Sequence, residues 1–222
     1  MRRLGSAAHR DLLLIALTFS SGAVDAISFL ALGKVFTAFM TGNIVFLGIG
    51  IAGAGGPDAV AVIAALFVFG AGVLLATRIV RPSQGSGTWP GRVTVTLGVA
   101  AVVQTAFFTV WSAVGGQPSS DTSDVLIALS ALAMGIQSGA ILSLGVRGVF
   151  TTAATATVMF LASDVAGSDP PSAERRRLGG VLTALLSGAV AGALLLVNAR
   201  AWAPILPLAA NLLVVMTAAM RR

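Results

Sequence analysis

Residues 35–53 read VFTAFMTGNIVFLGIGIAG, and residues 149–167 repeat much of this pattern as VFTTAATATVMFLASDVAG. At an offset of 114 the two stretches agree at eight positions, among them the pairs Phe36-Thr37 and Phe46-Leu47. Chance explains matched Ala and Val in so apolar a chain, but not these pairs. Each copy follows a helix with polar residues and precedes two apolar helices. The pattern therefore predicts an internal duplication of about 12–114 and 125–220.

The composition around these stretches is that of a membrane protein. Of the 222 residues, 56% are hydrophobic and only 10% are charged, against roughly 25% charged in a soluble domain. A soluble enzyme, a nucleic-acid binder and a disordered tail are thereby excluded. The net charge of +6 comes from basic residues at the ends of apolar runs, where they act as topology signals. We expect an all-α protein with one membrane domain over 1–222.

The charged residues divide the chain into eight apolar stretches. A helix needs about 20 residues to cross the hydrocarbon core. Six stretches satisfy this and predict transmembrane helices. The two copies of the repeated pattern, 35–56 and 148–163, are expected to be re-entrant or broken, because the first is rich in Gly and the second is short and rich in Thr. The six predicted spans are 12–33, 59–77, 93–120, 125–146, 178–199 and 201–220.

The distribution of basic residues favours this arrangement. If all eight stretches crossed, eight Arg would lie on the side of the N-terminus and six basic residues on the other. If the two repeated stretches return to the face they came from, only Lys34 and Arg200 lie opposite the N-terminus. The positive-inside rule favours the second model, with both termini cytoplasmic and the loop 115–124 outside. Three crossings per copy then make the two copies inverted repeats, a plan found in many transporters.

Asp25 is an acid about midway along the first predicted helix. Such a residue costs roughly 2.5–3.5 kcal/mol at the helix centre, so it must face the bundle interior, a cavity or a partner. One interpretation is a proton or cation site, or a polar contact for a solute. The other is a structural acid that is protonated or hydrogen-bonded to a broken helix end.

Further polar residues are expected at the same depth. Turns within the two short segments would expose backbone groups, which are tolerated only when buried in protein or lining water. Gln137 and Ser138 take the positions in the second copy that Val24 and Asp25 hold in the first. Alternatively, the small and hydroxyl residues simply let helices pack closely. The predicted solute or ion pathway consists of Asp25, Thr41, Gly42, Asn43, Gln137, Ser138, Thr151, Thr155 and Thr157.

The sequence offers no residues for enzymatic or metal chemistry. His9 is the sole His and lies in the N-terminal tail, so no Ser-His pair or His-based metal centre is expected within the membrane. The chain has no Cys. We therefore expect neither an enzyme nor a cofactor nor a metal site. Gln104 has no evident counterpart in the other copy and is interpreted as an interhelical hydrogen bond.

Three motifs resemble those of a known family: Gly22-Ala-Val-Asp25-Ala26, Gly33-Lys-Val-Phe36 and Met40-Thr41-Gly42-Asn43. They are similar to the YoaK-like bacterial membrane proteins, a family of uncharacterised function, and the likeness covers nearly the whole chain. The resemblance implies a multi-spanning protein of the bacterial inner membrane and names no substrate. The second copy departs from the pattern, because Ala156 stands where the turn of the first copy has Gly42.

Three functions remain open on these grounds. The first is a small secondary transporter or permease with a polar site between inverted repeats. The second is a channel-like pore on the same architecture, and the third is a scaffold that transports nothing. The expected partners are the lipid bilayer and a small solute or ion, with no nucleic acid, and a homo-oligomer is left open.

Overall fold

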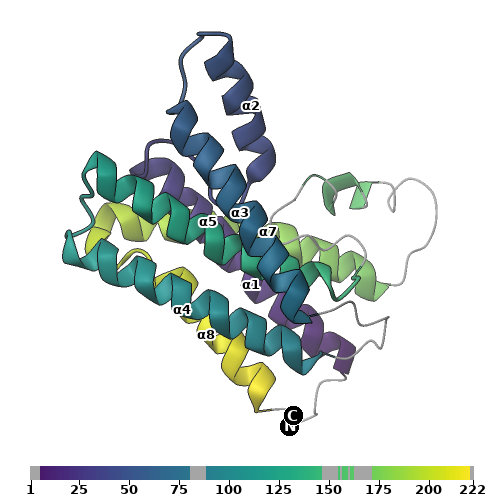
Figure 1. Ribbon diagram of the computed structural model, residues 1–222. Helices are drawn as coiled ribbons and strands as arrows, with labels where there is room; N and C mark the ends of the chain where they lie inside the picture. Colours follow the sequence, from purple (N-terminus) through teal and green to yellow (C-terminus); the bar gives the residue numbers. More distant parts are fainter. Residues whose placement is uncertain are drawn as a thin grey trace.

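The computed structural model describes residues 6–80, 89–146, 155, 157–159, 161–162 and 172–220. Within these residues the chain is helical, without strands (Figure 1). The elements are α1 (Ser6–Ala31), α2 (Met40–Ile51), α3 (Ala59–Val80), α4 (Gly91–Ala113), α5 (Ser120–Leu142), α7 (Ser172–Asn198), the short 3-10 helix η1 (Arg200–Trp202) and α8 (Ile205–Ala219).

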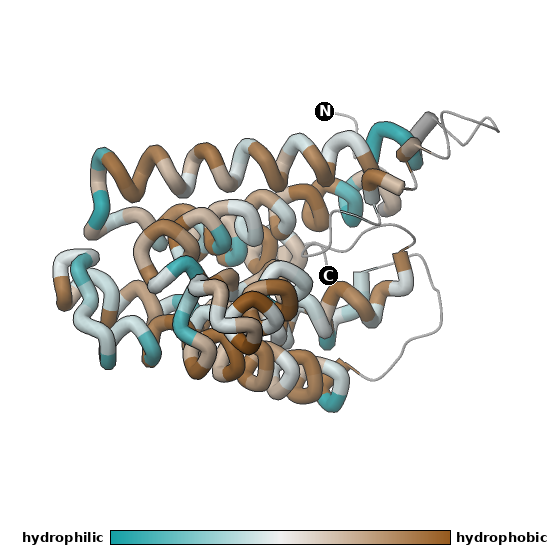
Figure 2. The backbone as a smooth tube through the Cα atoms, turned by 90° about the horizontal axis from the view of Figure 1, so that it is seen from above, coloured by the Kyte–Doolittle hydropathy of each residue, from teal (hydrophilic) through white to brown (hydrophobic). Residues whose placement is uncertain are grey.

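Six helical stretches are long and apolar enough to cross a membrane, which confirms the six predicted spans. They are α1, α3, α4, α5, α7, and α8 together with η1. By contrast α2 has 12 residues, a length of about 18 Å against a hydrocarbon core of about 30 Å. In Figure 2 the hydrophobic residues run along the helices and the hydrophilic ones gather toward their ends and connections.

One helix boundary differs from its prediction for a local reason. The loop expected over 115–124 is shorter, because α5 begins at Ser120. The Ser119 side chain accepts a hydrogen bond from the backbone N–H of Thr122, and Asp121 lies in the first turn. Such a cap and an acid at a helix N-terminus both favour helix, so residues that read as a polar loop extend the span.

Two hydrophobic clusters show which helix ends lie together. The first cluster contains side chains from the last turns of α1, α4 and α7 and from the first turns of α3 and α5. Its members include Ile27, Val62, Trp111, Leu126 and Leu196, and this end of the bundle is called the Trp111 end. The second cluster contains side chains from the first turns of α1, α4 and α7 and from the last turns of α3, α5 and α8. Its members include Leu14, Val80, Val93, Ile141, Val181 and Val214, and this opposite end of the bundle is called the Leu14 end. Successive spans therefore run in alternating directions through the bundle.

This alternation determines the course of the two short segments. Since α1 ends and α3 begins at the Trp111 end, the chain over 32–58 returns to the end it came from. In Figure 1 α2 lies beside the first half of α3, at an angle to the other helices. In the same way α5 ends and α7 begins at the Leu14 end. Most of the connection between them, including the repeat copy 149–167, lies outside the described residues.

The closest helix crossings depend on glycines. A Cβ on Gly22 of α1 would overlap the backbone oxygen of Leu185 in α7, and one on Gly188 of α7 would overlap that of Phe19. The pair α3 and α5 shows the same arrangement. There a Cβ on Gly135 would overlap the oxygen of Phe69, and one on Gly72 would overlap that of Leu132. Small residues thus bring backbones into contact, as in other membrane helix pairs.

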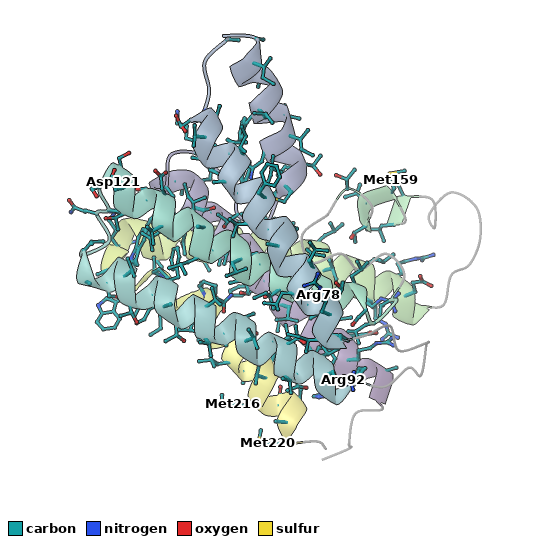
Figure 3. All side chains as sticks on the ribbon, viewed as in Figure 1. Arg78, Arg92, Asp121, Met159, Met216 and Met220 are labelled. Atoms are coloured by element: carbon teal, nitrogen blue, oxygen red, sulfur yellow. The ribbon has the colours of Figure 1, made fainter. Side chains whose placement is uncertain are left out.

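Charged residues divide between the two ends of the bundle. In Figure 3 Arg78 and Arg92 lie at the end away from Asp121. Arg78 lies two residues before Val80, and Arg92 directly precedes Val93, both of which belong to the Leu14 end. By contrast, the backbone oxygen of Arg200 accepts a hydrogen bond from Trp111 at the Trp111 end. The distribution agrees with the charge asymmetry that the sequence predicts.

Because the chain has no Cys, single cysteines can report the side of each loop. We expect Lys34→Cys, Ala54→Cys and Gln117→Cys to react with a membrane-impermeant maleimide from one side of the membrane, and Arg78→Cys from the other. The reason is that residues 54 and 117 both follow helices that end near the Trp111 end. Labelling of Ala54→Cys from the side opposite to Lys34→Cys would mean that the 35–56 segment crosses the membrane.

Trp111 joins two connections at its end of the bundle. Its fully buried indole N–H donates to the backbone oxygen of Arg200 at 2.8 Å, and the Arg200 guanidinium donates to the oxygen of Gly116 at 2.6 Å. Trp111→Phe should lower the free energy of unfolding by about 1–3 kcal/mol, because it leaves a buried carbonyl without this donor. Thermal unfolding in detergent measures the effect. Trp202→Phe, at a side chain that is 59% exposed, is the control and should have little effect.

Candidate functional site

Asp25 organises the chain reversal that follows α1. Helix α1 ends at Ala31 and is followed by Gly33 and Lys34, both in the left-handed conformation with φ of 77° and 63°. The Asp25 Oδ1 accepts hydrogen bonds from the backbone N–H groups of residues 37, 38 and 39, at 3.1, 2.8 and 3.3 Å. Asp25 lies six residues before the end of α1, about 9 Å along its axis. The chain therefore folds back to that depth before α2 begins.

Asn43 closes the same turn from the side of α2. Its fully buried side chain accepts a hydrogen bond from the N–H of Phe36 at 3.0 Å and donates one to the oxygen of Phe36 at 2.6 Å. Gly42 lies against the Phe39 ring, where a Cβ would come within 2.7 Å of a ring carbon. Residues 42 and 43 thus shape the turn, while the Thr41 side chain is exposed.

Aromatic rings hold the end of α1, the turn and α2 together. Phe29 of α1 stacks on Phe36 of the turn, with ring centroids 4.9 Å apart. Phe46 of α2 lies 5.8 Å from the same ring, and Phe39 meets it edge-on at 5.4 Å. The polar turn around Asp25 is therefore enclosed by aromatic side chains on one side.

A groove of about 590 Å³ opens beside Asp25, chiefly between α1 and α7. This volume lies in the range of about 300–1,000 Å³ that is typical of small-molecule sites. Among the described residues, Asp25 and Thr155 supply its polar side chains. The described residues that line it are Gly22, Asp25, Ala26, Phe29, Leu30, Phe36, Phe39, Thr155, Leu185, Ala189, Val190 and Ala193.

A second group of polar residues, here the polar seam, lies inside the bundle. Gln137 of α5 donates to Ser21 of α1 at 3.1 Å. Gln104 of α4 accepts from Asn211 of α8 at 3.0 Å. These contacts join α5 to α1 and α4 to α8 at positions where lipid offers no alternative partner. The Thr37 hydroxyl, 2.7 Å from that of Ser130 on α5, joins the turn to the seam.

The polar seam is closely packed. A cavity of about 20 Å³ lies beside Gln104 and Ser130, with room for about one water molecule. Several buried polar atoms have no hydrogen-bond partner within the described parts of the chain: Gln104 Nε2, Gln137 Oε1, Ser138 Oγ and Asn211 Oδ1. Such atoms are costly to leave unpaired, so they are candidates for contact with a polar solute.

The predicted pathway residues separate into three groups. Asp25 and Thr155 line the groove, Gly42 and Asn43 form the turn beside it, and Gln137 belongs to the polar seam with Ser138 next to it on α5. Thr157 is buried and Thr41 is exposed. Thr151 lies outside the described residues. Among the residues that are described, no three His, Asp or Glu side chains lie close enough to hold a metal ion.

Sequence reasoning missed four seam residues: Thr37, Ser130, Ser21 and Asn211. Thr37 is one of the repeat identities, so it carried a signal of its own. Asn211 is an amide in the last span and forms the partner for Gln104 that the repeat alignment did not supply. Ser130 and Ser21 gave no such signal, because Ser also occurs in helices of this kind merely as a small packing residue.

Comparisons with known proteins agree with this membrane architecture. The family model described as "Protein of unknown function (DUF1275)" matches residues 13–218. The "UPF0700 transmembrane protein YoaK" of Bacillus subtilis (strain 168) is 36% identical over 162 residues, which cover 73% of this chain and 70% of that protein. No solved structure matches the chain. The chain therefore belongs to the DUF1275 family of YoaK-like, multi-pass transmembrane proteins.

Proposed function

We propose that this protein is a small secondary transporter or permease in which Asp25 is the proton- or cation-binding group. One observation carries the proposal. A carboxylate within a transmembrane helix holds the turn of a discontinuous segment through three backbone N–H groups and also lines a groove of about 590 Å³. An acid within a membrane helix marks a substrate or proton path by default, and transporters place such sites beside interrupted helices.

The helix contacts support an arrangement as inverted repeats. In the proposed repeat, α1, α3 and α4 of the first copy correspond to α5, α7 and α8 of the second. The contact of α1 with α7 then corresponds to that of α5 with α3, and the contact of α1 with α8 corresponds to that of α5 with α4. The glycines at the two closest crossings correspond as well, Gly22 to Gly135 and Gly188 to Gly72. Alternating helix directions make the corresponding helices antiparallel. We propose that both termini are cytoplasmic, in the inner membrane of a bacterium.

Packing of the polar seam favours a carrier over a pore. Within the described residues, the cavity at Gln104 and Ser130 has room for about one water molecule. A carrier whose polar seam is closed requires a conformational change that opens it to the solute. Protonation of Asp25, or a cation bound to it, would weaken its charge-assisted bonds to residues 37–39, because bonds to an ionised acceptor are about twice as strong as neutral ones. The turn would then be free to shift against α5.

Electrical recordings of proteoliposomes on a solid-supported membrane test the proposal. The probes are tetramethylammonium, alanine, glucose and phosphate, each applied at several pH values. We expect the wild type to give a saturable current with at least one probe, and Asp25→Asn to reduce it at least tenfold. Asp124→Asn removes an exposed acid near the start of α5 and should behave as the wild type.

Each alternative gives a different result in these recordings. Currents that do not saturate, together with single-channel steps in planar bilayers, would indicate a pore. No current above that of empty liposomes for all four probes would support a scaffold and overturn the transporter. An unchanged current for Asp25→Asn across pH would remove Asp25 from the mechanism.

A further inference from the structure

We propose that the groove beside Asp25 binds a lipophilic cation, such as a hydrophobic amine or a quaternary onium ion, which enters it from the bilayer. This inference rests on the proposed function in that it names the class of ligand for the same site.

The walls of the groove select for an apolar ligand. Of the twelve described residues that line it, ten are Gly, Ala, Val, Leu or Phe. A sugar or a zwitterion would have to bury many hydroxyl or charged groups with only Asp25 and Thr155 to pair them. Because unpaired polar groups are costly in such surroundings, the lining excludes these ligands.

The charge of the groove selects for a cation. Oδ1 of Asp25 is occupied by the turn, whereas its Oδ2 has no hydrogen bond to any described residue. Among the described residues that line the groove, none is Lys, Arg or His. The N-terminus of α2 supplies only about half of a positive charge. An anion would therefore meet an uncompensated carboxylate, and a cation would neutralise it.

Aromatic rings add to this selectivity. Phe29, Phe36 and Phe39 all line the groove on the side of the turn. The faces of aromatic rings attract cations, most strongly where water is excluded, and this attraction requires no hydrogen-bond donor on the ligand. A quaternary cation without any N–H group is therefore a suitable probe.

The groove opens on a surface that faces lipid. Leu30 of α1 and Val190 of α7 lie at its margin, with 55% and 51% of their surface exposed. On the neighbouring turn of α7, Leu186 is 68% exposed. Exposed large apolar side chains on a transmembrane helix contact acyl chains, so a ligand dissolved in the bilayer reaches Asp25 without crossing the polar ends of the bundle.

Binding of radiolabelled tetraphenylphosphonium to the full chain in nanodiscs of zwitterionic lipid tests the inference, with empty nanodiscs as the blank. We expect saturable binding to the wild type and to Asp124→Asn, and at least a tenfold loss of affinity in Asp25→Asn. Radiolabelled tetraphenylborate, an anion of nearly the same shape that is measured by itself because it pairs with the phosphonium, should show no saturable binding. Ala193→Phe keeps the acid but fills the groove, and should also weaken binding.

Several results would overturn the inference. These are an absence of saturable phosphonium binding, saturable binding of tetraphenylborate with equal affinity, or unchanged affinity in Asp25→Asn. If Asp25→Asn does not fold, as judged by gel filtration, Ala193→Phe and the tetraphenylborate comparison decide. Binding is measured without transport, so the two proposals fail separately. Currents with no phosphonium binding reject this ligand class alone, whereas phosphonium binding with no currents rejects the transporter and retains the site.

Discussion

Asp25→Ala should destabilise the protein by at least about 3 kcal/mol, whereas Asp25→Asn should leave it folded. The Ala variant leaves the N–H groups of residues 37–39 without their acceptor, and each buried donor left unpaired costs roughly 1–3 kcal/mol. The cost is higher within a membrane, where water is not at hand to replace the lost bond. Asn keeps an oxygen at the same position and serves nearly as well as Asp at the start of a helix.

Two measurements separate these outcomes. Thermal unfolding in detergent reports global stability, and hydrogen exchange of the amides of residues 37–39 reports the turn itself. In Asp25→Ala these amides should exchange much faster than in the wild type or in Asp25→Asn. Equal unfolding temperatures for the Ala variant and the wild type would contradict the role of Asp25 in the turn. A folded Asp25→Asn is also what makes its loss of transport interpretable.

The second large effect is expected from one added methyl group at a helix crossing. Gly22→Ala and Gly188→Ala each place a Cβ onto a backbone oxygen of the opposite helix. A backbone atom does not move aside as a side chain does, so α1 and α7 must separate. Overpacking of this kind costs typically about 1–3 kcal/mol, and we expect the upper part of that range for each variant.

Other glycines in this chain provide matched controls of opposite sign. A Cβ on Gly98 of α4 or on Gly70 of α3 would meet nothing within 4 Å. Gly98→Ala and Gly70→Ala should therefore raise stability, by about 0.5–1 kcal/mol, because Ala favours helix over Gly. Thermal unfolding of all four variants gives the comparison. Equal effects at Gly22 and Gly98 would show that the crossing of α1 and α7 tolerates greater separation.

Sequence patterns were sufficient for the architecture because a membrane imposes strong rules. A span requires about 20 apolar residues and basic residues favour one face, so the six transmembrane helices could be predicted from apolar runs and charges. The course of the 35–56 segment followed from the same charges. Helix ends were less well predicted, since Ser119 caps α5 through a local hydrogen bond that apolarity does not reveal.

The sequence predicted the candidate site only in part. The sequence indicated Asp25 because an acid within an apolar transmembrane helix is energetically costly. It did not distinguish a binding role for Asp25 from a structural one. The structure assigns one oxygen of Asp25 to the turn and places the carboxylate in the wall of a groove. It also pairs Gln104 with Asn211, 107 residues away.

Apolar length and charge placement, both properties of the linear chain, were enough to predict six membrane-spanning helices and a 35–56 segment that does not cross. Only the tertiary structure decided which polar groups meet. Asp25 and Thr155 come to one groove, and Thr37 meets Ser130, because glycines let α1 approach α7 and α3 approach α5. Hydrogen bonds act over about 3 Å, and the contacts between residues so far apart in the chain are set by helix packing rather than by any local pattern.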